Sequence, residues 1–163
     1  MKKLFLIRHA KSSWDEPNLS DYERPLNERG KKDAPMMSSI LKEKNIFPDL
    51  IISSTAERAA ETANIFASEL NYTKTIHYDS RIYEATTQNL LEVLSEIDDD
   101  HNLVFLFGHN PGLSNFANFI SKTPVLNMPT TCIVGLELTI NKWKEVERHS
   151  GNVFMYEFPK KYK

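Results

Sequence analysis

The sequence predicts an α/β fold in which a mostly parallel central sheet is flanked by helices in a three-layer sandwich. Residues 4–7, 50–52 and 103–107 are short, unbroken apolar runs, typical of strands buried on both faces of a parallel sheet. A segment with helical spacing of apolar residues follows each run. We expect one domain over residues 1–163, because a chain of 163 residues that is 40% hydrophobic suits a single globular core.

The clearest helix is expected between Thr55 and Leu70. Its apolar residues fall on one face at helical spacing: Ala59, Ala63, Phe66, Ala67 and Leu70. Ser54 and Glu57 match an S-x-x-E capping box at its start. This pattern predicts that Arg58 lies in the first turn, beside the positive end of the helix dipole.

Three more helices and two more strands are expected. Asn27 begins a helix that extends to residue 41, and Pro35 should kink or split it. The other helices cover residues 90–97 and 111–120. The strands cover residues 132–138 and 153–158 and complete the sheet. The one cysteine, Cys132, lies in an apolar run and is expected to be a buried core thiol.

Composition excludes several classes of partner. A formal net charge of −2, from 20 basic and 22 acidic residues, gives no electrostatic reason to expect nucleic acid or an anionic membrane. The apolar stretch at residues 4–7 is too short for a signal peptide or a membrane span, so we expect a cytoplasmic protein. The sequence does not indicate an oligomeric state.

Polar residues that suit an anion follow three of the predicted strands. Arg8 and His9 follow the first strand, Arg58 follows the second, and His109 follows the run that ends at residue 107. Ligands bind outside the carboxyl ends of the strands in such folds, so these side chains should meet at one edge of the sheet. An unpaired arginine beside a buried strand is costly to desolvate, and a bound phosphate would supply its partner.

Simpler explanations exist for each of these residues taken alone. The two arginines could pair with structural carboxylates such as Glu57 or Glu61. His9 could be a hydrogen-bonded structural histidine and His109 a turn residue. Three other histidines match no motif and are expected to be structural or exposed: His77, His101 and His149.

Four motifs, in this order, resemble those of the histidine phosphatase superfamily. They are the Arg-His pair at residues 8–9, RPLNERG at 24–30, SSTAER at 53–58 and GHNPG at 108–112. Ala10 stands where the family usually has glycine. The short chain and its RHAKS and GHNP variants are most similar to the SixA-like phosphohistidine phosphatase branch. The resemblance implies a phosphoglycerate mutase-like fold without a large cap.

The resemblance also implies a mechanism. His9 would attack phosphorus and form a phosphohistidine, which water then cleaves. Arg8, Arg58 and His109 would neutralise charge on the phosphoryl oxygens, so neither a metal nor a cofactor is expected.

Two carboxylates are candidates for the acid that protonates the leaving group. Glu84 resembles the L-x-E position that supplies this acid in many superfamily members, although an exposed loop carboxylate is an alternative. Asp15 competes with it, and it stands where mutase-like relatives usually have asparagine. A carboxylate there would repel a dianionic substrate unless it is protonated or turned away, so Asp15 is either an alternative acid or a rim residue.

Other residues are candidates for binding substrate. Lys11, Ser12 and Asn110 would add donors to a phosphate pocket, and their alternative roles are a solvated lysine, a turn hydroxyl and a helix cap. Three more side chains could line the mouth of the site: Trp14, Tyr22 and Arg24. Core packing is the alternative for the tryptophan, and surface exposure is the alternative for the other two.

The leading hypothesis for function is a phosphatase that acts on phosphohistidine in a protein. Small phosphomonoesters are the alternative substrates. Imidazole leaves phosphorus more readily than an alkoxide and depends less on a proton donor, so the presence of Glu84 slightly favours the esters. The absence of a long insertion after Ser12 favours an open site that admits a protein side chain. A noncatalytic phosphate- or phosphopeptide-binding module is the alternative from another class.

Overall fold

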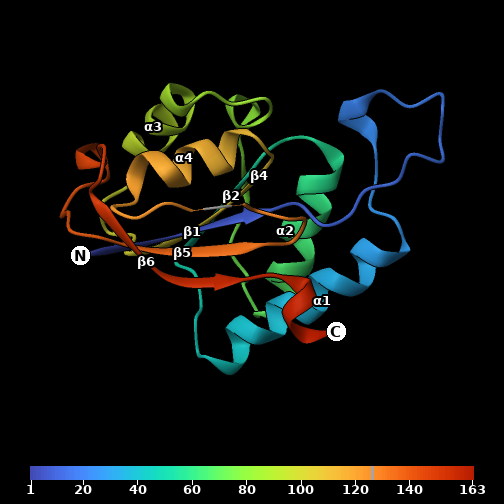
Figure 1. The fold of residues 1–163 in the computed structure, drawn as a ribbon, viewed down its shortest axis with the longest axis horizontal. Helices are drawn as coiled ribbons and strands as arrows, with labels where there is room; N and C mark the ends of the chain where they lie inside the picture. The colour runs from blue at the N-terminus through green and yellow to red at the C-terminus, as the bar shows by residue number, and fades with distance from the viewer. Residues whose placement is uncertain (126) are drawn as a thin grey trace.

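The structure, a computed structural model that describes residues 1–125 and 127–163, is built around one six-stranded sheet (Figure 1). Its strands are β1 (Lys2–Arg8), β2 (Leu50–Ser53), β3 (His77–Tyr78), β4 (Leu103–Gly108), β5 (Ile133–Leu138) and β6 (Gly151–Glu157). The strand order is β3-β2-β4-β1-β5-β6. The pairs among β1, β2, β3 and β4 are parallel, whereas β5 pairs antiparallel with both β1 and β6. The predicted α/β fold with a mostly parallel sheet is confirmed.

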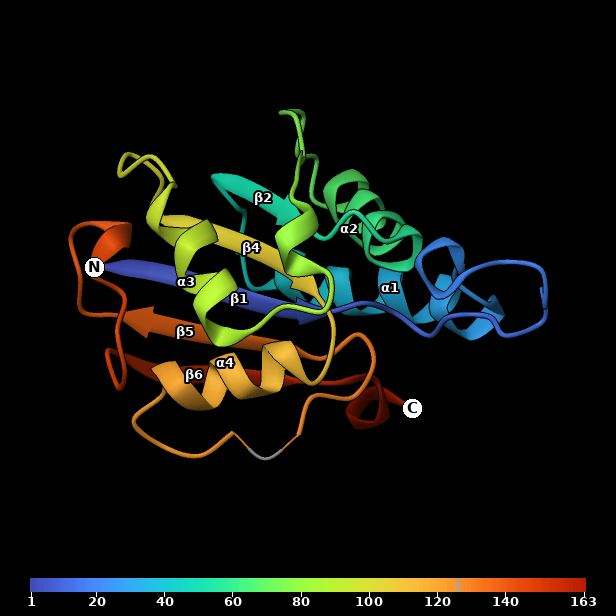
Figure 2. The same ribbon diagram turned by 90° about the horizontal axis from the view of Figure 1, so that it is seen from above.

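Two layers of helices cover the sheet (Figure 2). The helices are α1 (Glu28–Glu43), α2 (Glu57–Glu69), α3 (Thr87–Ser95) and α4 (Gly112–Ile120). One core joins α3 and α4 to the sheet, and the other joins α1 and α2 to its opposite face. Residues of β1 alternate between these cores, so that Leu4 and Leu6 belong to the first and Phe5 and Ile7 to the second. A strand with both faces buried therefore appears in the sequence as an unbroken apolar run.

Two local expectations were wrong. Ser54 and Glu57 do not form a capping box: α2 begins after Ala56, and the Ser54 hydroxyl lies too early in the chain to cap it. That hydroxyl instead accepts a hydrogen bond from the Ala56 N–H and contacts His109. Pro35 does not split α1, which is a single helix from residue 28 to residue 43. The buried apolar face of α1 offsets the backbone hydrogen bond that proline removes.

The remaining element boundaries agree closely with the sequence patterns. The added strand β3 has only two residues, both exposed, and therefore carries no apolar signal. Cys132 is buried, as expected, and burial raises the pKa of its thiol to about 12. No helix in the described part of the chain is long and apolar enough to cross a membrane.

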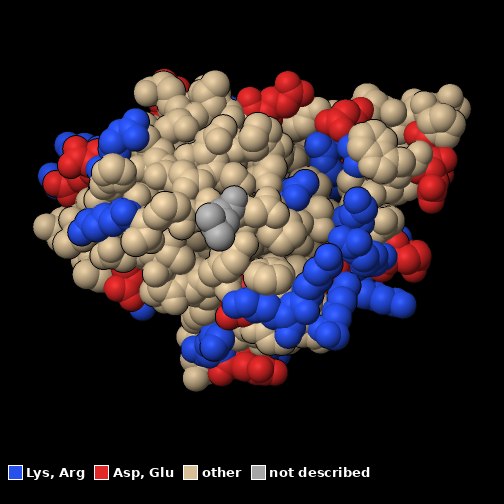
Figure 3. Space-filling view, viewed as in Figure 1, with Lys and Arg blue, Asp and Glu red and all other residues tan. Residues whose placement is uncertain are grey.

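Charge is unevenly distributed over the surface. Lys and Arg side chains gather over α1 and the C-terminal segment on the face shown in Figure 3. Two of these cations, Arg29 and Lys163, pair with the buried carboxylate of Asp33, at 3.6 Å and 2.9 Å. The carboxyl ends of the parallel strands lie beside this region, and the segment between β1 and α1 extends past them (Figure 1).

Candidate active site

The predicted site residues lie at the carboxyl ends of three adjacent parallel strands. In the sheet, β1 lies next to β4, which lies next to β2, and Arg8 is in register with Gly108. The His9 N–H donates to the Gly108 carbonyl at 3.0 Å, and the Ser54 N–H donates to the Phe107 carbonyl at 2.9 Å. The hydrogen bonding between strands thus continues by one residue beyond β1 and β2, and it holds the segments that follow these strands next to β4.

The His9 imidazole is fixed in one tautomer by its own backbone. Its Nδ1 lies 2.7 Å from the Ala10 carbonyl oxygen, which can only accept, so Nδ1 carries the proton. Nε2 therefore presents a lone pair, toward which the Arg58 Nε–H is directed at 3.4 Å. His9 is 6% exposed. Burial is the main cause that lowers the pKa of His9 to about 3, and the nearby His109 and arginines act in the same direction, so the ring is neutral at physiological pH.

Arg58 lies in the first turn of α2, as the sequence predicts, and its guanidinium is buried. It does not pair with Glu57 or Glu61. Its partner is Asp21 of the short helix η1 (Asp21–Glu23). Nη1 donates to the Asp21 main-chain carbonyl at 2.7 Å, and Nη2 donates to the Asp21 Oδ2 at 3.1 Å.

His109 lies beside His9, with 5.2 Å between the ring centroids. Its Nε2 shares a hydrogen bond of 2.8 Å with Ser54 Oγ, while its buried Nδ1 has no hydrogen-bond partner among the described residues. Burial is the main cause that lowers the pKa of His109 to about 3, with Arg58 second. A buried polar atom without a protein partner is rare, and in this position it is available to bind water or a ligand.

Arg8 has a similar free donor. Its Nη1 donates to the Met128 carbonyl at 3.0 Å, but its Nε is buried and has no partner among the described residues. The structure thus brings Arg8, His9, Arg58 and His109 together, with unpartnered nitrogens on the first and last of them. A phosphate oxygen is the type of acceptor that a guanidinium Nε–H binds most strongly.

A profile of the histidine phosphatase superfamily (branch 1) matches residues 4–103, more than half of the chain. The chain belongs to the histidine phosphatase superfamily. An uncharacterised chloroplastic protein of Arabidopsis thaliana is 30% identical over 92% of this chain and 72% of its own length. Phosphoglycerate mutase 1 of Saccharomyces cerevisiae is 40% identical, but over only 40% of this chain and 27% of the mutase.

Solved structures of superfamily members share the whole fold. A protein of Agrobacterium tumefaciens, provisionally identified as the phosphohistidine phosphatase SixA, superimposes with a TM-score of 0.79 at 25% identity. The match covers 97% of this chain and 98% of that protein. The histidine phosphatase SixA complexed with tungstate gives a TM-score of 0.85 at 18% identity, over 99% of each chain. The chain is SixA-like, and those of its relatives that are named by activity are phosphatases or mutases, which supports phosphatase activity.

A pocket of about 440 Å³ leads from solvent to Arg58 and His109. Glu84 and Asn110 also line it, together with Asp21 and Tyr83. The Glu84 carboxylate is exposed, and its backbone has a φ of 53°, a left-handed conformation that costs a non-glycine residue about 1 kcal/mol or more. The structure therefore places the candidate acid Glu84 at the pocket mouth.

The other candidate substrate-binding residues divide into two groups. Asn110 is a pocket residue that precedes Pro111, the N-cap residue of α4, and its Oδ1 accepts from the Ser114 N–H in the first turn at 3.3 Å. Ser12 is buried and is hydrogen bonded to Arg24. Lys11 is partly exposed, whereas Asp15 is exposed and is not a lining residue of the pocket, which favours the rim alternative for Asp15.

The structure excludes two of the alternatives for the mouth residues. Trp14 does not pack in the core: its side chain is 72% exposed and stacks on the Arg24 guanidinium, 3.3 Å from the ring centroid. Arg24, for which surface exposure was the alternative, is buried. Tyr22 is exposed, in agreement with its alternative, and packs edge-on against Tyr83, with 5.2 Å between the ring centroids.

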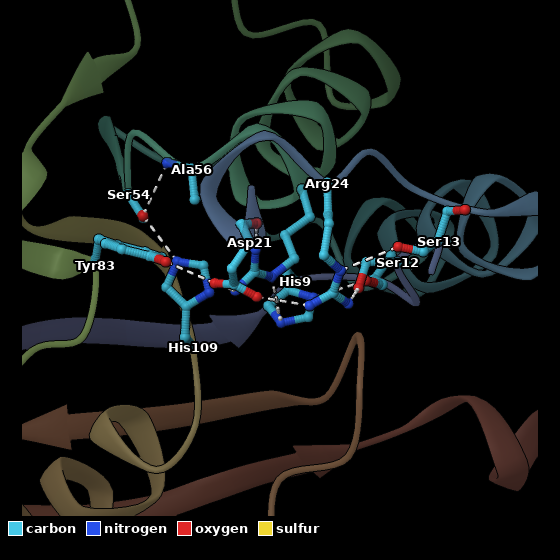
Figure 4. Close-up of polar contacts among 11 residues, drawn as sticks. His9, Ser12, Ser13, Asp21, Arg24, Ser54, Ala56, Tyr83 and His109 are labelled. Atoms are coloured by element: carbon cyan, nitrogen blue, oxygen red, sulfur yellow. Dashed lines mark hydrogen bonds and ion pairs between the residues drawn. The ribbon is translucent and has the colours of Figure 1, made fainter. Parts of the chain in front are cut away.

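Asp21 and Tyr83 were not identified from the sequence. Figure 4 shows Asp21 between Tyr83 and Arg24. Tyr83 donates to the Asp21 Oδ2 at 2.6 Å, and this bond is the main cause that raises the pKa of Tyr83 to about 12. Tyr83 is the central residue of the motif that pointed to Glu84, and Asp21 precedes Arg24 by three positions. That short spacing, which suits an ion pair, was the one available signal for Asp21.

Among the described residues, no group of three or more His, Cys, Asp or Glu side chains is arranged to hold a metal ion. The charge available to an anion comes from Arg8 and Arg58. The arrangement as a whole offers a neutral imidazole nucleophile, two guanidinium groups and a second histidine within one small volume. This combination suits transfer of a phosphoryl group to His9.

Proposed function

We propose that the protein is a metal-independent phosphatase that acts through a phosphohistidine on His9, with phosphohistidine in a protein as its main substrate. The observation that carries this proposal is the state of the His9 ring. Its Nδ1 proton is held by the Ala10 carbonyl, so the Nε2 lone pair faces the same space as the Arg58 guanidinium. Nε2 accepts only a long hydrogen bond, 3.4 Å from the Arg58 Nε, so the lone pair that would attack phosphorus lies beside a cation that would bind a phosphoryl oxygen.

The first step forms one bond and breaks one bond. The Nε2 lone pair of His9 attacks phosphorus, and the bond from phosphorus to the leaving nitrogen or oxygen breaks and leaves its electron pair on that atom. Arg8, Arg58 and His109 stabilise the negative charge on the three phosphoryl oxygens. The proton stays on Nδ1 of His9 and remains hydrogen bonded to the Ala10 carbonyl oxygen, which stabilises the positive charge that develops on the ring.

The second step returns the enzyme to its starting state. Water attacks phosphorus and gives one proton to the carboxylate that Glu84 became in the first step. The bond between phosphorus and Nε2 breaks, and its electron pair returns to the His9 ring. Inorganic phosphate is released. The leaving group of the first step needs a proton, and Glu84 is the candidate donor because it lines the pocket at the solvent side of His109.

Two observations support a protein substrate. The pocket opens to solvent. Among the described residues, no large inserted segment lies between the strands and helices of the sandwich (Figure 1). The SixA proteins, which are named as phosphohistidine phosphatases, match the chain over nearly its whole length. A phosphohistidine side chain on a partner protein would reach Nε2 through such an opening.

Small phosphomonoesters are the second candidate class, and Glu84 favours them. An alkoxide leaving group depends on a proton donor, whereas imidazole depends on one much less. A binding module is less well supported, since anion affinity alone requires the arginines but not the oriented nucleophile.

The experiment is a comparison of turnover in the presence of a chelator. The substrates are a phosphohistidine-bearing carrier protein, free phosphohistidine and a panel of phosphomonoesters. We expect the highest kcat/KM for the carrier protein and no loss on chelation, because arginines supply the neutralising charge. Faster hydrolysis of one ester would assign the small-molecule class. Activity that a chelator abolishes and a divalent ion restores would refute the mechanism.

A further inference from the structure

We propose that Asp21 is a positioning residue, which holds the Arg58 guanidinium so that its Nε edge faces the phosphoryl group on its way to His9. This inference rests on the proposed function and adds to it a residue from outside the four family motifs. It follows from the contacts of the guanidinium, from the way the carboxylate is itself held, and from a contrast with other acidic residues near the pocket.

The contacts of Arg58 divide its guanidinium into two parts. An arginine has five N–H groups, and three of those on Arg58 are committed. Nη1 and Nη2 both donate to Asp21, to the main-chain carbonyl and to Oδ2. Nε donates toward His9 Nε2, the atom to which phosphorus would bond. Asp21 therefore holds the far end of the guanidinium and leaves the edge formed by Nε and Nη2 toward the reacting atoms.

The Asp21 carboxylate is itself held from three sides, although its side chain is 47% exposed. Its Oδ2 accepts from Tyr83 and Arg58, and its Oδ1 accepts from the Arg24 Nη1 at 2.7 Å. Arg24 is anchored in turn, because its Nε donates to the Ser13 carbonyl at 3.0 Å. An exposed ion pair usually stabilises little, but a network of fixed donors keeps the geometry of each member.

Charge alone would suggest the opposite role. A carboxylate close to a phosphate site repels a dianion, so Asp21 could act as a competitor for Arg58 rather than as its support. The hydrogen bonds from Tyr83, Arg24 and Arg58 lower the pKa of Asp21 to about 2, so it is ionised and cannot act as the acid. Two cations and a phenol offset its charge, and its contacts are with the end of the guanidinium that points away from His9 Nε2. Support is therefore the role that the geometry favours.

Two carboxylates serve as matched controls. Asp15 is exposed in the same loop as Asp21 and is not a pocket-lining residue, so Asp15→Ala is the control for turnover. Glu84 lines the same pocket and is exposed, but it makes no ion pair with Arg58, so Glu84→Ala is the control for phosphate binding alone. A change that is due only to charge near the mouth should alter phosphate affinity in the same way in Glu84→Ala and Asp21→Ala, whereas a loss that is due to the hold on Arg58 should be specific to Asp21→Ala.

The test is Asp21→Ala with chemical rescue by formate. This variant removes one carboxylate from a position that opens to solvent, and formate has the size and charge to replace it. Turnover of para-nitrophenyl phosphate and of a phosphohistidine peptide would be measured with formate and with chloride at equal ionic strength. Binding of inorganic phosphate would be measured by calorimetry in the same samples, beside Glu84→Ala and Asp15→Ala.

We expect Asp21→Ala to lose about 10- to 100-fold in kcat/KM, with most of the loss in kcat, because a misplaced group near the reacting atoms has effects of this size. Phosphate binding should weaken several-fold, and formate should restore several-fold of the lost turnover. Turnover by Asp15→Ala should not respond to formate.

Three results would overturn the inference. They are wild-type turnover and phosphate affinity in Asp21→Ala, tighter phosphate binding by that variant, and a loss that formate does not relieve. Failure of the proposed function is a separate result, because the wild-type protein would then bind phosphate without hydrolysing either substrate.

Discussion

The floor and the rim of the active site are built in different ways. The floor consists of residues at the ends of β1, β2 and β4, and its three central side chains, His9, Arg58 and His109, are each no more than 8% exposed. The rim consists of residues 13–24 and 83–85, and most of its side chains are exposed. In the proposed mechanism, the floor holds the nucleophile and the charges for phosphoryl transfer, whereas the rim is open to the leaving group. We therefore expect changes in the floor to affect all substrates and changes in the rim to affect them selectively.

The largest effect is expected for His9→Ala. Loss of the nucleophile should lower kcat by about 10⁴-fold or more for every substrate, as the loss of a covalent nucleophile does in other enzymes. Phosphate binding should persist, because the arginines remain. Single-turnover assays and calorimetry would check this. Normal turnover by a folded His9→Ala protein would exclude the phosphoenzyme.

For the rim, Glu84→Gln should separate the two substrate classes. Hydrolysis of esters with poor leaving groups should fall about 100-fold, the lower range for general acid catalysis, while hydrolysis of a phosphohistidine peptide should change by less than about threefold. Asp15→Asn is the control and should leave both rates within about twofold. If Glu84→Gln slows both substrates equally and Asp15→Asn shows the dependence on leaving group, the acid is Asp15.

The buried histidines of the floor should make the free energy of unfolding depend on pH. His9 and His109 have pKa values of about 3 in the folded protein, below the usual value of 6.5, so the unfolded chain binds more protons between these pH values. The free energy of unfolding should therefore fall as the pH decreases from 6.5 toward 3, by about 1 kcal/mol per pH unit for each histidine. Urea denaturation at pH 7 and pH 5 would measure this.

The control for that measurement is a histidine outside the floor. His9→Ala should give a shallower fall than the wild-type protein, whereas His77→Ala, at an exposed position of β3, should not. Equal slopes for the wild-type and His9→Ala proteins would mean that the His9 ring is not held neutral by burial.

The smallest effect is expected at Ser54, which supports the floor from β2. Ser54→Ala removes the hydrogen bond to His109 Nε2, and a bond of about 1 kcal/mol corresponds to roughly fivefold in kcat/KM. The loss should be the same for esters and phosphohistidine, unlike the loss in Glu84→Gln. A loss that depends on the leaving group would move Ser54, and with it His109, into the protonation step.

The same contrast explains what the sequence could predict. Arg8, His9 and Arg58 each follow a buried strand, so local pattern and one topological rule were enough to place them together. The contact between Asp21 and Arg58 joins residues 37 positions apart, and that between Tyr83 and Asp21 joins residues 62 apart, through loops without a periodic pattern. Such contacts depend on tertiary structure, and no local propensity encodes them.

Local rules failed where a side chain had a stronger tertiary partner. The Ser54 hydroxyl matched a helix-capping pattern, but it contacts His109 of a neighbouring strand exit instead. Trp14 is a large aromatic residue of a type that often packs in a core, yet its exposed ring stacks on Arg24. Pro35 would end an isolated helix, but α1 retains its form because it packs on the sheet. Ser54 and Trp14, two of these three exceptions, lie in or beside the segments that build the site, whereas Pro35 does not.

Trapping the phosphoenzyme tests the central claim most directly. The protein would be mixed with a phosphohistidine peptide and quenched within milliseconds, and the labelled residue would be identified by mass spectrometry under alkaline conditions and by ³¹P NMR. We predict one phosphoryl group per chain, bonded to Nε2 of His9 and absent from His9→Ala. Turnover without a phosphoryl group on His9, or with one on another residue, would contradict the proposed mechanism.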